Sequence, residues 1–219
     1  MSGKRLNVFV SVKGHGFDRN ALENMVRACG AEPTIVDQPA ASLLMNPSSL
    51  RGYDAVLLYD MWGMDFQCRR EERPASVSPD PVLVAGWEAL LQQGKGIVAL
   101  HHAIAGWPAW DGYARMLGGR FLYRNDMLCG RERQDSGYAA DVPYAVATCG
   151  NHPVLSDVPA RFELRDELYA MEILEEEEEL FPLIVRETDV DPALFQSASN
   201  AVRRVSADEA APWVPPRDN

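Results

Sequence analysis

The chain has 219 residues, of which 47% are apolar and 24% are charged, a composition typical of a folded globular protein. The 21 Lys and Arg residues against 32 Asp and Glu give a net charge of −11, which repels phosphate backbones and anionic bilayers and argues against nucleic-acid or membrane partners. No segment approaches the run of about 18 apolar residues that a membrane span requires, and the N-terminal segment is too polar for a signal-peptide core. We therefore expect a cytoplasmic protein.

The N-terminal half predicts strands that alternate with amphipathic helices. Residues 6–12 (LNVFVSV) are rich in β-branched residues and lead into Gly14, which predicts a strand and a tight turn. Asp18 then precedes an apolar stripe that stops at Gly30, which is typical of a capped helix. The other elements predicted in this half are strands at 34–36, 55–59 and 96–100, a helical turn at 46–50, and helices starting at Pro81 and Trp110 and stopping at Gly94 and Gly118.

This alternation predicts an α/β fold with a mostly parallel sheet and helices on both faces, a three-layer arrangement. The second half is less regular and predicts strands at 143–148, 161–164 and 183–185, which we expect as antiparallel additions at the sheet edge. One domain over residues 1–187 and a loosely held C-terminal tail over 188–219 follow from the composition, which turns to Ser, Ala, Asp and Pro after Thr188.

The four cysteines, Cys29, Cys68, Cys129 and Cys149, include no CxxC pair, and a chain of this size folds without disulfides. We therefore expect reduced thiols. Cys149 and His152 form a CxxH pair that could be half of a metal site, but packing of a buried thiol explains Cys149 better.

Polar side chains follow most of the predicted strands. His15, Asp60, the pair His101 and His102, His152, and Asp166 with Glu167 each come directly after a strand. Ligands of open α/β sheets bind beyond the carboxyl ends of the strands, so we expect His15, Asp60, His101, His102 and Glu167 to line one cleft. The alternative for each residue alone is that it caps a turn or fills a gap in the core.

No motif for a serine or cysteine nucleophile or for phosphate binding accompanies these residues, since GxSxG, GxGxxG and GxxxxGK[ST] are all absent. Histidine and carboxylate chemistry remains. His15, His102 and His152 are the candidate ligands of a divalent metal such as zinc. His102 and His101, with Glu167 as acid/base partner, are the candidate catalytic residues.

Aromatic side chains flank the same positions. Trp62, Trp107 and Tyr169, together with Asp60, are the candidate substrate-binding residues, because flat rings with polar tips suit a sugar-sized polar ligand. Core packing explains Trp110 and Tyr113 at least as well.

Three segments, YDAVLLYDM, GKGIVALHHAIAGWPAWDGYARMLGGRF and HPVLSDVPARFELRDELY, resemble the ThuA-like (trehalose-utilisation) family over about residues 5–187. The resemblance implies a flavodoxin-like sheet of the class I glutamine amidotransferase-like superfamily. It also implies that His101 and His102 occupy the elbow at which true amidotransferases hold a catalytic cysteine, so amidotransferase activity should be lost. The Gly-Lys-Gly-rich strand and glycine-histidine turn that usually close such domains are absent after Arg186, which leaves the tail as a truncated or divergent end.

The resemblance further implies a role in sugar or keto-sugar metabolism, with a small sugar or polyol derivative as ligand. We expect an enzyme, and the alternative is a non-catalytic carbohydrate-binding or regulatory module. Assembly into a homo-oligomer stays open. Because His101 and His102 are adjacent, only one can reach a common ligand from a strand, and we expect His102 to be the freer member and His101 to pack under a helix.

Overall fold

The computed structural model describes residues 5–175, 179–206, 209–210 and 213. The chain divides into two compact units, which are taken in turn. The first comprises residues 1–65 and 75–113, and the second comprises residues 66–74 and 114–219. Within the predicted tail, residues 207–208, 211–212 and 214–219 lie outside the described residues.

A parallel sheet of four strands in the order β2-β1-β3-β6 forms the centre of the first unit. Its strands are β1 (Leu6–Lys13), β2 (Ala31–Asp37), β3 (Ala55–Asp60) and β6 (Gly96–Ala99). All four lie where the sequence predicts strands, because the β-branched runs and the glycine turns both mark them. A short antiparallel pair, β4 (Met64–Asp65) with β5 (Ala75–Ser76), completes the strands of this unit.

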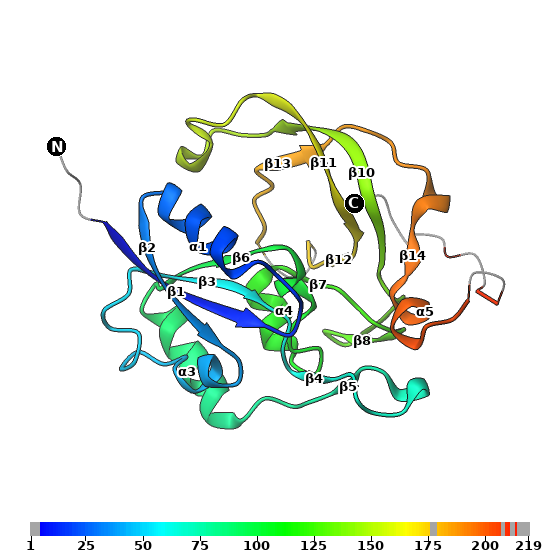
Figure 1. Ribbon diagram of the computed structural model, residues 1–219, viewed down its shortest axis with the longest axis horizontal. Coiled ribbons are helices and arrows are strands. Elements are labelled where there is room, and N and C mark those ends of the chain that lie inside the picture. Colours follow the sequence, from blue (N-terminus) through cyan, green and yellow to red (C-terminus); the bar gives the residue numbers. More distant parts are fainter. Residues whose placement is uncertain (1–4, 176–178, 207–208, 211–212, 214–219) are drawn as a thin grey trace. The chain divides into compact units, whose positions relative to one another are not determined.

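Helices pack on opposite faces of β1. The helix α1 (Arg19–Ala28) buries Leu22 and Val26 against Val8, Val10 and Val12, which share one face of the strand. On the other face, Ser11 lines a small cavity together with Trp87 of α3 (Pro81–Gln92). Figure 1 shows α1 and α3 flanking the sheet. The alternation of side chains along β1 therefore decides which helix each residue meets.

The ends of both helices follow from local sequence. Asp18 accepts a hydrogen bond from the Ala21 N–H at 3.0 Å, and Asp80 accepts one from the Val82 N–H at 2.7 Å with Pro81 in the first turn. Gly30 and Gly94 follow the C-termini with positive φ. The remaining helices are α2 (Ala40–Leu43), the 3-10 helix η2 (His101–Ala105) and α4 (Asp111–Leu117). Residues 46–50 form a single turn in which the Leu50 N–H donates to Asn46 O at 3.0 Å, which agrees with the predicted helical turn.

The second unit is built on the long strand β10 (Gly137–Thr148), which pairs antiparallel with β11 (Arg161–Ala170), β13 (Ile184–Arg186) and β14 (Gln196–Ser197) (Figure 1). Its other elements are η1 (Arg70–Glu72), β7 (Gly119–Arg120), β8 (Asp126–Leu128), β9 (Arg131–Arg133), η3 (Pro153–Leu155), β12 (Glu172–Ile173), η4 (Pro192–Leu194) and α5 (Ala198–Arg203). In the described residues the antiparallel strands form sheets of their own, which corrects the prediction that they extend the edge of the parallel sheet. The pattern of a strand predicts that it forms but not which strands it pairs with, because pairing depends on residues elsewhere in the chain.

Residues after Thr188 take part in this unit. Strand β14 pairs with β10, and Trp213 donates a hydrogen bond from Nε1 to Asp135 Oδ1 at 3.0 Å. The Trp213 ring lies so close to Gly137 that a Cβ there would come within 2.4 Å of it. The predicted boundaries, 1–187 and 188–219, stay a prediction.

Candidate functional site

The turn after β6 presents the adjacent histidines. Leu100 continues the strand pairing through its N–H to Leu58 O at 2.9 Å, and η2 begins at His101. His101 has φ 49° and an exposed side chain, whereas His102 is only 2% exposed. A left-handed residue at a strand-to-helix turn is strained, and such strain is common at functional sites. The expectation that His102 is the freer residue and His101 the packed one is therefore wrong, because the strand ends before both and the turn swings His101 outward.

Three aromatic rings surround the His102 imidazole. The ring centroids of Tyr59, His15 and His101 lie 4.5, 4.8 and 5.5 Å from that of His102. Neither ring nitrogen of His102 has a well-formed hydrogen bond to the described part of the chain. Burial, and then the neighbouring His15 and His101, lower the pKa of His102 to about 4. A hydrogen bond to the Tyr59 backbone has a smaller effect and raises this pKa. At neutral pH the imidazole is uncharged and offers one donor and one acceptor.

The loop after β1 brings His15 to this ring. Gly14 has φ 93°, and a Cβ at this position would lie 1.9 Å from Met61 O, so only glycine lets the loop pass the end of β3. His15 is exposed, and its Nδ1 lies 3.0 Å from Gly16 O. The structure thus brings together three of the predicted residues, His15, His101 and His102.

Asp60 does not join this cluster. It faces the side of β3 opposite to Tyr59, whose ring contacts His102. Its side chain is buried, with the residue 4% exposed, and Oδ2 accepts a hydrogen bond from Gln38 Nε2 at 2.7 Å. Burial raises the pKa of Asp60 to about 6. The role of Asp60 in substrate binding stays a prediction.

Trp107 is likewise a core residue. It is 7% exposed, its N–H donates to Trp62 O at 2.7 Å, and its ring covers Gly63 so closely that a Cβ there would lie 2.6 Å away. Trp62 is half-buried. Of the two predicted sugar-binding indoles in this unit, only Trp62 has exposed surface of any extent.

Glu167 and Tyr169 belong to the second unit. Strand β11 continues to Ala170, so Asp166 and Glu167 lie within an antiparallel strand, and the prediction that they follow it in a loop is wrong. The register shifts opposite them, where Asp141 has φ 56° and forms a two-pronged ion pair with Arg165. Tyr169 packs on Phe121, with ring centroids 5.0 Å apart.

His152, also in the second unit, has a structural role. Its Nδ1 accepts a hydrogen bond from the Val154 N–H at 3.2 Å and so caps η3. Cys149 donates its Sγ hydrogen to Pro182 O at 2.8 Å, and none of the four cysteines forms a disulfide. Among the residues that the structure describes, no group of three or more His, Cys, Asp or Glu side chains is arranged to hold a metal ion. The zinc site predicted from His15, His102 and His152 combines residues of both units and stays a prediction.

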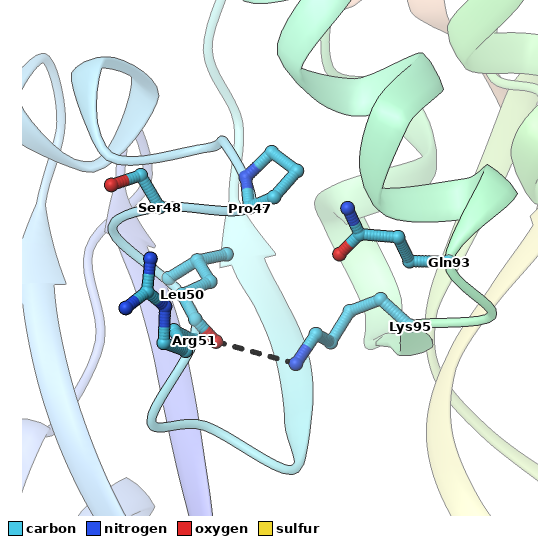
Figure 2. A pocket seen from close by; sticks show the side chains of 6 residues that line it. All are labelled: Pro47, Ser48, Leu50, Arg51, Gln93 and Lys95. Carbon is cyan, nitrogen blue, oxygen red and sulfur yellow. Dashed lines mark hydrogen bonds between the residues drawn. The ribbon is translucent and has the colours of Figure 1, made fainter.

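A surface pocket of about 360 Å³ lies in the first unit beside the residues that precede β3 and β6, far along the strands from the histidines. Figure 2 shows Gln93 and Lys95 facing Pro47, Ser48, Leu50 and Arg51 across it. Lys95 Nζ donates to Leu50 O at 3.3 Å and to Tyr53 O, which fixes the loop before β3. None of the predicted site residues lines this pocket.

The sequence reasoning missed Gln38, which donates a hydrogen bond to the Asp60 carboxylate, and it left Tyr113 open between core packing and a ligand role. Gln38 comes directly after β2, so the rule that selected residues at the carboxyl ends of strands would have found it. The Tyr113 hydroxyl donates to Ala103 O at 3.0 Å, and no local signal in a helical stripe distinguishes such a hydroxyl from a packing ring.

The fold and these residues define an α/β protein with a histidine-bearing turn at the carboxyl edge of a parallel sheet. The family model for ThuA, trehalose utilisation, matches residues 7–201, and the chain belongs to this family. A ThuA-like protein from Parabacteroides merdae has a similar structure, with a TM-score of 0.55, 15% identity, and coverage of 85% of this chain and 70% of the other. A GMP synthase subunit from Thermoplasma acidophilum, at a TM-score of 0.39 and 11% identity over 76% of this chain and 68% of that one, is less similar. No curated protein matches the sequence.

Proposed function

We propose that this protein acts in sugar or keto-sugar metabolism by binding a small sugar or polyol derivative at the histidine turn. The family supports a role related to sugar metabolism. The observation that carries the site is the buried His102 ring, neither of whose nitrogens has a well-formed hydrogen bond to the described residues. Unsatisfied buried donors and acceptors are rare, and sugar hydroxyl and carbonyl groups are their natural complement.

The chemistry open to this site is proton transfer. A neutral imidazole accepts a proton from a ligand hydroxyl or from a carbon next to a carbonyl, and a lowered pKa keeps it in that state. The exposed His101 is the second candidate group on the turn, and Trp62 is the candidate sugar-stacking ring. The elbow carries an imidazole in place of a thiol, so we expect no glutamine-dependent amidotransferase activity.

Other predictions remain proposals of their own. Glu167 as acid/base partner and Tyr169 as a substrate-binding residue are tested by Glu167→Gln and Tyr169→Ala.

The finer fold prediction, a three-layer flavodoxin-like arrangement, is supported in the first unit by α1 and α3 on opposite faces of β1. A cytoplasmic location is supported by the four reduced cysteines. No helix among the described residues is long and apolar enough to cross a membrane.

The test is ligand binding and turnover with the whole chain. Saturation-transfer NMR against trehalose, glucose and a 3-keto-disaccharide detects binding, and 13C NMR of the same mixtures detects conversion. We expect a sugar to bind, a product to form, and His102→Gln to abolish conversion in a folded protein while binding is largely kept. Binding without conversion by the wild type would favour the non-catalytic module, and absence of binding by every sugar would refute the proposal.

A further inference from the structure

A small cavity lies in the first unit on the side of β3 that carries Asp60. Buried side chains of Ser11, Gln38, Asp60, Trp87, Trp107 and Tyr113 contribute to its lining. The room inside, about 10 Å³ for the centre of a water-sized sphere, is sufficient for one water molecule and too small for a sugar. The cavity is therefore not a substrate site, and although most of its lining surface is apolar, the Asp60 and Tyr113 side chains are among those that line it.

One oxygen of Asp60 in this region lacks a partner. Oδ2 accepts from Gln38, and the Ser11 side chain also hydrogen-bonds to the carboxyl group, but Oδ1 is buried without a well-formed hydrogen bond among the described residues. Gln38 cannot turn to satisfy Oδ1, because its Nε2 also lies 3.2 Å from Ser11 Oγ and its Oε1 accepts from the Ser42 hydroxyl at 2.6 Å. A buried carboxylate oxygen without a donor is costly, so a further donor is required.

Tyr113 offers the second acceptor. Its hydroxyl hydrogen is donated to Ala103 O, so the lone pairs of Oη remain. Asp60 and Tyr113 line the same cavity, and burial and then the charge of Asp60 raise the pKa of Tyr113. Lys13 is the register partner of Asp60 on β1 and has an exposed side chain, and Gln38 and Ser11 are neutral. The lining thus presents two acceptor oxygens with lone pairs to spare, and a water molecule has two hydrogens to give.

We propose that this cavity binds one water molecule that donates to Asp60 Oδ1 and to Tyr113 Oη, and that Asp60 and Tyr113 are thereby positioning residues for the histidine turn. The link to the turn is direct, because Ala103, whose carbonyl oxygen accepts from Tyr113, follows His102 in η2. Gly106 closes the same turn, where a Cβ would lie 3.2 Å from Ala103 O and 3.3 Å from Tyr113 Oη. The Tyr113 hydroxyl therefore holds the turn through its hydrogen bond to Ala103 O, and the proposed water holds the hydroxyl in place.

The experiment compares Tyr113→Phe with the matched control Tyr53→Phe, which removes a hydroxyl from the same unit at a ring that packs on Phe9. The readouts are oxygen-17 relaxation dispersion at pH 8, which counts long-lived internal water, and the imidazole NMR signals of His101 and His102. We expect Tyr113→Phe to lose one internal water and to shift both imidazole signals, and Tyr53→Phe to change neither. Unchanged histidine signals in Tyr113→Phe, or a cavity empty of water in a crystal structure at this pH, would overturn the proposal.

A second variant covers the case in which Tyr113→Phe does not fold. Asp60→Asn removes the acceptor charge but keeps the shape, and we expect it to shift the same imidazole signals, whereas an unchanged spectrum would count against the positioning role. One further expectation rests on the proposed function, namely that Tyr113→Phe weakens sugar binding. We expect the affinity to fall roughly threefold to tenfold, the usual effect of losing one hydrogen bond. If no sugar binds the wild type, the proposed function fails while the water and imidazole readouts still decide this inference.

Discussion

His102 and Asp60 are both buried ionisable groups, but burial acts on them in opposite directions. The charged form is disfavoured in each case, so the histidine pKa falls to about 4 and the aspartate pKa rises to about 6. Between these values both groups are uncharged. In mildly acidic solution His102 is therefore a neutral base and Asp60 a neutral acid. The pKa of each group can be measured by titration.

The His102 imidazole should titrate far below an ordinary histidine. We expect its Cε1–H NMR signal to move with a midpoint near pH 4 in the folded protein, because burial and two neighbouring histidines oppose its protonation. His15→Ala should raise this midpoint, since one source of repulsion is removed. Leu43→Ala on the exposed surface of α2 is the control and should leave the midpoint unchanged. A midpoint near 6.5 in the wild type would contradict the burial of the ring.

Asp60 should make the protein less stable as the pH rises. Its folded pKa of about 6 lies above the ordinary value of 3.8, so the folded state holds the proton more tightly than the unfolded state. The free energy of unfolding contributed by this group is therefore largest below pH 3.8 and falls by about 3 kcal/mol as the pH passes through 6.

Urea unfolding of wild type and Asp60→Asn between about pH 4 and 7 measures this effect. We expect the difference in unfolding free energy between the two proteins to change by up to about 3 kcal/mol over this range, in favour of the variant at higher pH. The His102 contribution has the opposite sign, since stability is lost as the pH falls from 6.5 towards 4, but it is common to both proteins. A constant difference would show that Asp60 is not buried in the folded state.

At the scale of single elements, helix α1 depends on its N-terminal cap. Asp18→Ala removes the acceptor of the Ala21 N–H and should lower the free energy of unfolding by about 1 kcal/mol. Asp18→Asn keeps an acceptor oxygen at the same place and should cost much less. Denaturant unfolding of the two variants side by side is the measurement, and equal losses would show that charge rather than the hydrogen bond matters.

Helix α3 depends on a close backbone contact. Alanine favours a helix over glycine by roughly 1 kcal/mol, yet a Cβ on Gly86 would lie 2.1 Å from Met45 O. The steric overlap should outweigh the helix propensity, so we expect Gly86→Ala to destabilise the protein. Val82→Ala on the exposed face of the same helix, with Val82 80% exposed, should have little effect. Thermal unfolding checks both, and a stabilised Gly86→Ala would show that α3 can shift away from Met45.

At the scale of the whole molecule, the net charge of −11 sets the choice of partners. We expect no binding of DNA or RNA oligonucleotides at physiological salt, because few phosphate contacts can offset long-range repulsion. Fluorescence polarisation with labelled single-stranded and duplex oligonucleotides measures this directly. Saturable binding that weakens steeply with salt would reveal a basic patch and contradict the argument from total charge.

The local pattern of the sequence determined the elements of the first unit. Strands β1, β3 and β6, the caps Asp18 and Asp80, and the glycines that end α1 and α3 are encoded by residues within a few positions of one another, so they could be predicted. The same pattern placed His15, His101 and His102 at strand ends, and the parallel sheet gathers them, because carboxyl ends of parallel strands share one edge.

Only the tertiary structure decided the rest. Asp60 faces away from the ring cluster because side chains alternate along β3 and different helices cover its two faces. A short stretch of sequence does not show which helix covers which face. Strand β11 runs on through Glu167 because β10, which lies well before it in the chain, supplies the hydrogen bonds. Burial of His102 and exposure of His101 depend on the backbone angle of one turn, and the distant Tyr113 contacts that turn through Ala103. The arrangement of the site could not be predicted from sequence patterns, because it depends on contacts between residues far apart in the chain.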